Sequence, residues 1–187
     1  MGPGGTLSEP PALSPTPAWT VLARTTSADD TRALAAAFAD LVRPGDVVLL
    51  SGEMGAGKTA FTQGLGSALG VSERITSPTF TIVQTYEGSR IRIHHLDVYR
   101  LEHLHEALDV GLAEMVDDGA VVVIEWGDAV VPVLPADYLE IRIGFAPLDD
   151  DPASGDVRTW QLRPVGARWK ARADGLRATL AAWEDET

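Results

Sequence analysis

Eight residues in the first third of the chain, Gly52 to Thr59, have types and spacing suited to binding phosphate groups. Their sequence, GEMGAGKT, fits the phosphate-binding pattern G-x-x-x-x-G-K-[ST]. Glycines let the backbone curl until its N–H groups point at phosphate oxygens, and a helix start adds partial positive charge. Lys58 would bridge the terminal phosphates and the Thr59 hydroxyl would ligate Mg²⁺. The pattern predicts a nucleoside triphosphate site; the alternative is a glycine-rich turn that happens to contain a lysine.

A second part of such a site is an acid at the end of a neighbouring buried strand, which holds Mg²⁺ or positions water. Glu125 follows the apolar run 121–124 and is the best candidate; the alternative is an exposed acid at a strand end. His95, Asp97 and Tyr99 alternate, so an extended strand would place all three on one face. Such polar chemistry indicates a functional strand, and the alternative is a solvated sheet edge.

All four histidines lie between His94 and His105, which raises the question of a zinc site. His94 and His95 would point to opposite faces of a strand, and His103 and His105 do not share a helix face. The chain has no H-x-x-x-H pattern and no cysteine. The sequence therefore disfavours zinc.

The elements around these residues indicate an α/β fold. Residues 46–51 have the character of a buried strand, and residues 60–70 continue as a helix that stops at Gly70. Further strands are expected at 19–23, 80–86, 90–96, 120–125, 138–143 and 157–163. The strands 80–86 and 90–96 are expected to form an antiparallel hairpin, and 157–163 to pair with 138–143 across an acidic loop at 149–151. Helices are expected from Ser27, as N-cap, to about 42, at about 102–115 with an interruption near Gly111, and along 167–183.

Three regions are expected along the chain: a disordered Pro/Gly-rich leader at 1–18, a phosphate-loop ATPase domain at 19–164, and a helical tail at 165–187. The tail has one apolar helical face, made of Trp169, Ala173, Leu176, Leu180 and Trp183, which is expected to pack on the domain; the alternative is a helix that docks on a partner. The formal net charge is −12, from 15 basic and 27 acidic residues, and only Lys58 and Lys170 are lysines. This balance repels a nucleic-acid backbone, so any role with nucleic acid is expected to be indirect. The sequence has no cysteine, no pattern of a secretory signal and no apolar stretch of 18 residues. These features are expected of a cytoplasmic protein without a membrane span.

Four motifs in this order and spacing resemble the TsaE (YjeE) family, the ATPase component of the bacterial machinery that installs N6-threonylcarbamoyladenosine at position 37 of tRNA. They are GEMGAGKT at 52–59, SPTF at 77–80, HLDVYRL at 95–101 and Glu125-Trp126 after the apolar run. The resemblance covers about residues 19–143. It implies a phosphate-loop, three-layer α/β sandwich with a mixed sheet, an antiparallel hairpin, and helices on both faces.

The resemblance also implies roles for individual residues. Lys58 and Thr59 would hold ATP and Mg²⁺, Glu125 would be the second Mg²⁺ contact, and Thr79 and Asp97 would lie near the γ-phosphate in a switch-like segment. The nucleotide-binding residues would be Gly52, Glu53, Met54, Gly55, Ala56, Gly57, Lys58, Thr59 and Ala60, with Ser77, Pro78, His95, Tyr99, Arg100 and Trp126 as further motif positions.

The family is implied to dock, when loaded with ATP, onto a threonylcarbamoyl-transferase heterodimer of TsaB-type and TsaD-type subunits, and to reset it by hydrolysis. The partners would hold the tRNA, and the free chain is expected to be a monomer. Three alternatives remain at this point: a small-molecule kinase, a GTPase switch and a nucleotide-gated scaffold with negligible turnover. The chain contains no asparagine, so the guanine-reading Asn-Lys-x-Asp motif cannot be present.

Overall fold

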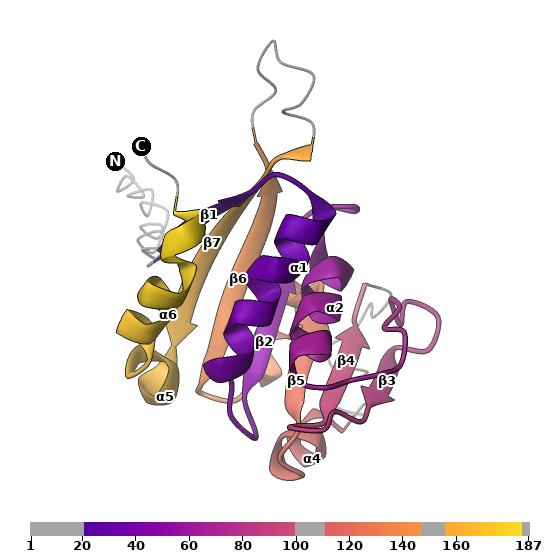
Figure 1. Cartoon of the computed structure of the whole chain (residues 1–187). Helices are drawn as coiled ribbons and strands as arrows, with labels where there is room; N and C mark the ends of the chain where they lie inside the picture. The colour runs from indigo at the N-terminus through magenta and orange to yellow at the C-terminus, as the bar shows by residue number, and fades with distance from the viewer. Residues whose placement is uncertain (1–20, 100–110, 147–155, 185–187) are drawn as a thin grey trace, which may run out of the picture.

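The computed structural model describes residues 21–99, 111–146 and 156–184. A seven-stranded mixed sheet in the order β1-β7-β6-β2-β5-β4-β3 forms its centre (Figure 1). The strands are β1 Val21–Thr25, β2 Val47–Ser51, β3 Val83–Tyr86, β4 Ile93–Asp97, β5 Val121–Glu125, β6 Tyr138–Phe145 and β7 Arg158–Val165.

The middle of the sheet is parallel and its two sides are antiparallel. β6, β2, β5 and β4 run in the same direction, whereas β3 pairs antiparallel with β4, and β7 pairs antiparallel with both β6 and β1. The expected hairpin and the expected pairing of 157–163 with 138–143 are therefore confirmed. Because β2, β5 and β4 are parallel neighbours, their carboxyl ends meet at one edge of the sheet.

Helices cover both faces of the sheet, as predicted. They are α1 Ala28–Ala37, α2 Lys58–Ala68, α4 Leu112–Asp117, α5 Gly166–Lys170 and α6 Ala173–Leu180, with short 3₁₀ helices η1 Phe38–Asp40, η2 Gly127–Val133 and η4 Ala181–Trp183. Figure 1 shows α1 and α2 side by side on one face, with α5 and α6 toward the β1–β7 side.

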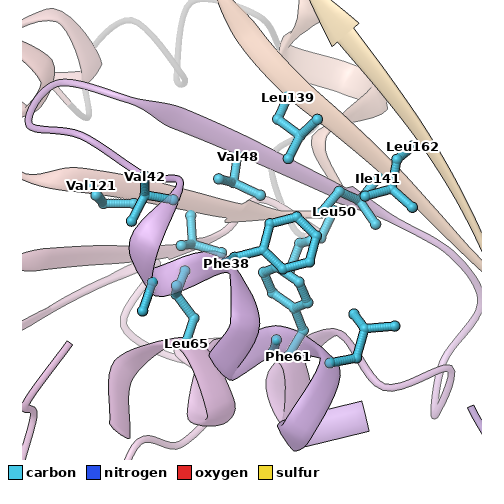
Figure 2. Close-up of a cluster of buried hydrophobic side chains, with 14 of the residues drawn as sticks. Phe38, Val42, Val48, Leu50, Phe61, Leu65, Val121, Leu139, Ile141 and Leu162 are labelled. Atoms are coloured by element: carbon cyan, nitrogen blue, oxygen red, sulfur yellow. The ribbon is translucent and has the colours of Figure 1, made fainter. Parts of the chain in front are cut away.

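Alternating residues of β2 supply the two halves of the core. Val48 and Leu50 belong to the cluster that also contains residues of α1, α2 and α6. Figure 2 shows Phe38 and Phe61 among the labelled side chains of this cluster, between helices and strands. Their ring centroids are 5.3 Å apart. Val47 and Leu49 face the other way, in a smaller cluster with residues of α4 and η2. The strand is buried on both faces, which explains its uninterrupted apolar sequence.

The segment at 80–86 differs from the prediction, because its strand begins only at Val83. The backbone N–H groups of Thr81 and Ile82 both donate to the carbonyl oxygen of Pro78, at 2.9 and 2.7 Å. Ile82 has a φ of 64°, which is not a strand conformation. The residues before Val83 therefore form a turn, and Phe80 is exposed on it.

The predicted helices differ from the observed ones at their ends. Ser27 is the N-cap of α1, as expected, and its hydroxyl accepts from the N–H of Asp30 at 3.0 Å, but α1 ends at Ala37 and η1 follows. The tail consists of α5 and α6, with a turn at Ala171 and Arg172 between them, and then η4. Of its predicted apolar positions, Trp169, Leu176 and Leu180 lie in the larger core cluster and Trp183 packs against it, whereas Ala173 does not belong to that cluster.

Several expectations fall on residues outside the described ranges. They are the leader at 1–18, most of the helix at 102–115, and the acidic loop at 149–151. Gly111, where a helix interruption was expected, is the N-cap of α4 and has a φ of 78°. Within the ranges described, no helix has the length and apolar character that crossing a membrane requires.

Candidate active site

The phosphate-binding sequence forms the connection between β2 and α2, as predicted. Gly52 leaves the strand with a φ of 146°, and a Cβ at this position would lie 2.3 Å from the carbonyl oxygen of Ile143. Gly55 and Gly57 also have positive φ values, of 79° and 116°, so the loop requires glycine for its backbone path. Gly57 is the N-cap of α2, and Lys58 is the first helical residue.

Lys58 is nearly buried, with 4% of its surface exposed. Its Nζ donates to the carbonyl oxygens of Gly52 at 2.8 Å and Glu53 at 2.9 Å, and lies 3.6 Å from the ring centroid of Trp126. Burial lowers the pKa of Lys58, and the negative charges of Glu125 and Asp97 oppose that change. The lysine is thus the cation facing both candidate acids.

Asp97 and Glu125 end two adjacent parallel strands and are direct register partners. Both carboxylates are buried, with 3% of each residue exposed. β4 lies between β3 and β5, so the alternative that Asp97 lies on a solvated sheet edge is wrong. Two carboxylates at neighbouring strand ends repel each other when both are ionised, so each needs its own hydrogen-bond donors and a nearby cation.

Glu125 receives its donors from α2 and β4. Its Oε1 accepts from the Thr59 hydroxyl at 2.9 Å and lies 2.8 Å from Nε2 of His95. His95 is completely buried beneath Glu125. His94, on the opposite face of β4 as predicted, contacts Thr85 and Asp118 instead.

Asp97 receives its donors from the segment before β3. Its Oδ2 accepts from the hydroxyls of Thr79 at 2.5 Å and Ser77 at 3.1 Å, and its Oδ1 accepts from the N–H of Tyr99 at 3.0 Å. The hydroxyls of Ser77 and Thr79 are 2.6 Å apart. The SPTF motif is therefore attached to the end of β4 through one carboxylate.

These residues surround one pocket of about 440 Å³. Its lining consists of Met54, Gly55, Gly57, Lys58, Thr59, Ala60, Ser77, Thr79, Asp97, Tyr99, Glu125 and Trp126. Some of the predicted site residues do not line the pocket. His95 contacts the pocket residue Glu125 from behind, and Pro78 is buried. The loop residues Gly52, Glu53 and Ala56 are not in the lining either, and Arg100 lies outside the described residues. A second cavity, of about 400 Å³ and lined partly by Arg32, Gln63 and Arg74, contains none of the predicted residues.

The position of Trp126 was not foreseen by sequence reasoning, which identified it only as a motif residue. Its φ of 62° turns the chain sharply after β5, and its ring contacts Tyr99 at a centroid distance of 4.8 Å as well as Lys58. Gly127 follows because a Cβ there would lie 1.8 Å from Leu49 Cδ1. An aromatic residue and a glycine directly after a strand-terminal acid were the available signal.

Comparison with known proteins gives a consistent family. Residues 25–148 match the family model described as threonylcarbamoyl adenosine biosynthesis protein TsaE. The proteins named tRNA threonylcarbamoyladenosine biosynthesis protein TsaE from Bacillus subtilis and Streptomyces coelicolor are 39% and 42% identical, over 82% and 76% of this chain and 91% and 95% of their own. The one from Treponema pallidum is 46% identical over 58% of this chain and 80% of its own.

A solved structure has the same arrangement of elements. The crystal structure of YdiB from Bacillus subtilis superposes with a TM-score of 0.69 at 31% identity, covering 84% of this chain and 94% of that one. The matched region contains the phosphate-binding loop and both strand-terminal acids described above. The chain therefore belongs to the TsaE family.

Proposed function

We propose that this chain is the Mg²⁺-dependent ATPase that supports threonylcarbamoylation of adenosine 37 in tRNA. The observation that carries the proposal is the convergence of Lys58, Thr59, Asp97 and Glu125 on one pocket, in a chain that belongs to the TsaE family. Family membership supports the tRNA pathway, whereas the pocket supports ATP chemistry.

The donor set fits a nucleotide bound together with a hard cation. The positive-φ glycines leave the loop without side chains where phosphates would approach, and Lys58 supplies a buried ammonium group. Thr59 Oγ1 and Glu125 Oε1 are 2.9 Å apart, and hydroxyl and carboxylate oxygens are ligands that Mg²⁺ prefers. Thr59 and Glu125 would hold the ion, which would neutralise charge on the phosphate oxygens during hydrolysis.

The other side chains around the pocket would each have a distinct role in binding or hydrolysis. Lys58 exchanges its two carbonyl acceptors for phosphate oxygens when nucleotide binds. Asp97 accepts hydrogen bonds from Thr79 and Ser77, so it fixes the SPTF segment at the pocket, where the terminal phosphate would lie. Asp97 and Glu125 can accept hydrogen bonds from a water molecule in the pocket, and the Trp126 ring packs against the Lys58 ammonium group.

Partners complete the proposed role. We propose that the ATP-loaded chain docks on a threonylcarbamoyl-transferase heterodimer of TsaB-type and TsaD-type subunits in the cytoplasm, and that hydrolysis resets the transferase. The net charge of −12 supports indirect contact with tRNA, because Lys and Arg side chains supply most affinity for a phosphate backbone. The free chain is proposed to be a monomer.

The proposal is tested by measuring ATP hydrolysis by the purified chain alone and with the transferase heterodimer. We expect slow Mg²⁺-dependent hydrolysis alone and a clear increase with the heterodimer. Equal rates in both mixtures, with no association in sedimentation or gel filtration, would contradict the docking step. Absence of ATP binding by the chain would contradict the whole proposal.

A further inference from the structure

His95 is a completely buried imidazole with a single hydrogen-bond partner. Its Nε2 lies 2.8 Å from Glu125 Oε1, whereas its Nδ1 is buried and has no hydrogen-bond partner among the residues that the structure describes. An ionised carboxylate can only accept, so the hydrogen in this bond belongs to the imidazole. A hydrogen on Nδ1 would be a buried donor with no acceptor, which proteins avoid. The neutral tautomer with hydrogen on Nε2 satisfies both conditions.

This hydrogen bond determines which carboxylate oxygen of Glu125 remains available to a ligand in the pocket. Oε1 is occupied by two donors, the Thr59 hydroxyl at 2.9 Å and the His95 imidazole. Within the described part of the chain, Oε2 has no hydrogen-bond partner, and Glu125 lines the pocket. Because Thr59 gives its hydrogen to Glu125, the lone pairs of its oxygen remain for a cation.

We propose that His95 is a positioning residue that fixes Glu125 and, through Glu125, Thr59 in the orientation that receives Mg²⁺. The inference rests on the proposed function. His95 contacts neither nucleotide nor metal in this role; it is the partner of a metal ligand, as residues behind metal sites commonly are. Without its Nε2–H, the Glu125 carboxylate would be free to rotate toward other donors, and Lys58 is a positively charged donor that interacts electrostatically with Glu125.

Two substitutions separate the hydrogen bond from simple packing. His95→Gln retains an amide donor in place of Nε2–H, whereas His95→Leu keeps an apolar side chain but removes the donor. His94→Gln is the matched control, because His94 contacts Thr85 and Asp118 on the other face of β4. The measurement is the affinity for ADP by calorimetry, in EDTA and in Mg²⁺, and the ratio of the two affinities.

We expect the gain in ADP affinity on adding Mg²⁺ to be at least tenfold smaller in His95→Leu than in the wild-type chain. The ADP affinity of His95→Leu in EDTA should stay within twofold of the wild-type value. His95→Gln should recover most of the gain, and His94→Gln should retain all of it. A wild-type gain in His95→Leu would overturn the inference, and so would a loss in His95→Gln as large as in His95→Leu.

A second measurement does not depend on variants that fold. Nitrogen-15 NMR of the nucleotide-free wild-type chain reports which ring nitrogen of His95 carries the hydrogen, and we expect Nε2. A ring that carries hydrogen on Nδ1 and none on Nε2 would overturn the inference even if ATP binds. If Mg²⁺ did not increase the ADP affinity of the wild-type chain, that result would instead contradict the proposed function. The positioning role of His95 would then be contradicted as well.

Discussion

Lys58 is already engaged by protein groups in this structure. Two carbonyl oxygens of its own loop accept from Nζ, and the Trp126 ring lies over it. Burial favours the neutral amine, whereas Glu125 and Asp97 favour the charged form. A phosphate group that replaced the carbonyls would pair with a largely desolvated cation, where charge-assisted hydrogen bonds are strong.

Substituting Lys58 should therefore remove most ATP affinity. We expect Lys58→Ala to weaken ATP binding by roughly 100-fold or more, since Lys58 would make two charge-assisted hydrogen bonds to phosphate and each contributes about 1.5–3 kcal/mol. Lys170→Ala is the matched control, because Lys170 is the only other lysine and is exposed on α5. Calorimetry with ATP distinguishes them, and equal affinity in both variants would remove Lys58 from the phosphate site.

Asp97 is expected to matter more for turnover than for binding. Thr79→Val removes one of the two hydroxyls that hold the SPTF segment on Asp97 and leaves only that of Ser77, whereas Asp97→Ala removes the acceptor of both. We expect ATP turnover to fall about 10- to 100-fold in both, a range typical of lost positioning, with smaller changes in ATP affinity. Thr81→Val is the control, since Thr81 bonds only the Pro78 carbonyl in the same turn. Wild-type turnover in Asp97→Ala would end this assignment.

At the scale of elements, close contact with α1 holds α2, the helix that follows the glycine-rich loop, in place. A Cβ at Gly64, on α2, would lie 2.2 Å from the backbone oxygen of Arg32 and 2.7 Å from its Cα on α1. Neither atom can move without moving its helix. The side chains of the same helices are linked too, since Arg32 Nε donates to Gln63 Oε1 at 3.1 Å.

Gly64→Ala should consequently destabilise the protein despite alanine's higher helix propensity. We expect the free energy of unfolding to fall by about 1–3 kcal/mol, the usual cost of overpacking. Gly175→Ala on α6 is the control, because a Cβ there would meet only a side-chain carbon of Leu41 at 3.4 Å. That variant should be neutral or gain up to about 1 kcal/mol. Urea denaturation measures both, and a stabilised Gly64→Ala would disprove the close packing.

Elements with an uninterrupted physical signal were predictable from sequence. β2 and β5 are buried on both faces, so their apolar runs stand out, and the glycine pattern between β2 and α2 has few other uses. The turn at Pro78–Ile82 was not predictable, because Phe80 and Ile82 alternate as a strand would. The strand is prevented by two backbone N–H groups, of Thr81 and Ile82, that both donate to the Pro78 carbonyl. No residue type in the segment indicates these two hydrogen bonds.

The candidate site was predictable as a set of residue types but not as a geometry. Lys58, Thr59, Asp97 and Glu125 were all identified by spacing. Their convergence depends on β4 being the parallel neighbour of β5 in a register that pairs Asp97 with Glu125. Strand order is a property of the whole sheet, so local sequence could not supply it, and the same holds for the contact of Trp126 with Lys58.

At the scale of the whole molecule, the C-terminal segment belongs to the same core as the phosphate-binding helix. Trp169, Leu176 and Leu180 are completely buried in the cluster that contains α1 and α2. These residues lie beyond the family match, which ends at residue 148. Arg172 joins this segment to the start of β2, since its guanidinium donates to Asp46 at 2.6 and 2.9 Å and to the Leu41 carbonyl at 2.8 Å.

Breaking this contact should lower stability without altering the site. The Asp46 carboxylate is 2% exposed, so Arg172→Ala leaves a buried charge with the Arg43 N–H and a longer contact to Arg168. We expect a loss of about 3 kcal/mol in the free energy of unfolding, as for other half-broken buried pairs.

The double variant Asp46→Asn with Arg172→Ala should lose less than the sum of the single variants Asp46→Asn and Arg172→Ala, because neither buried charge remains. Denaturant unfolding of all three variants gives the coupling energy, and Lys170→Ala serves as the neighbour that should change nothing. ATP affinity should remain at the wild-type value in each folded variant, since neither residue lines the pocket. Additive losses would mean that Arg172 and Asp46 stabilise the protein independently, and a drop in ATP affinity would mean that the segment acts on the site through β2.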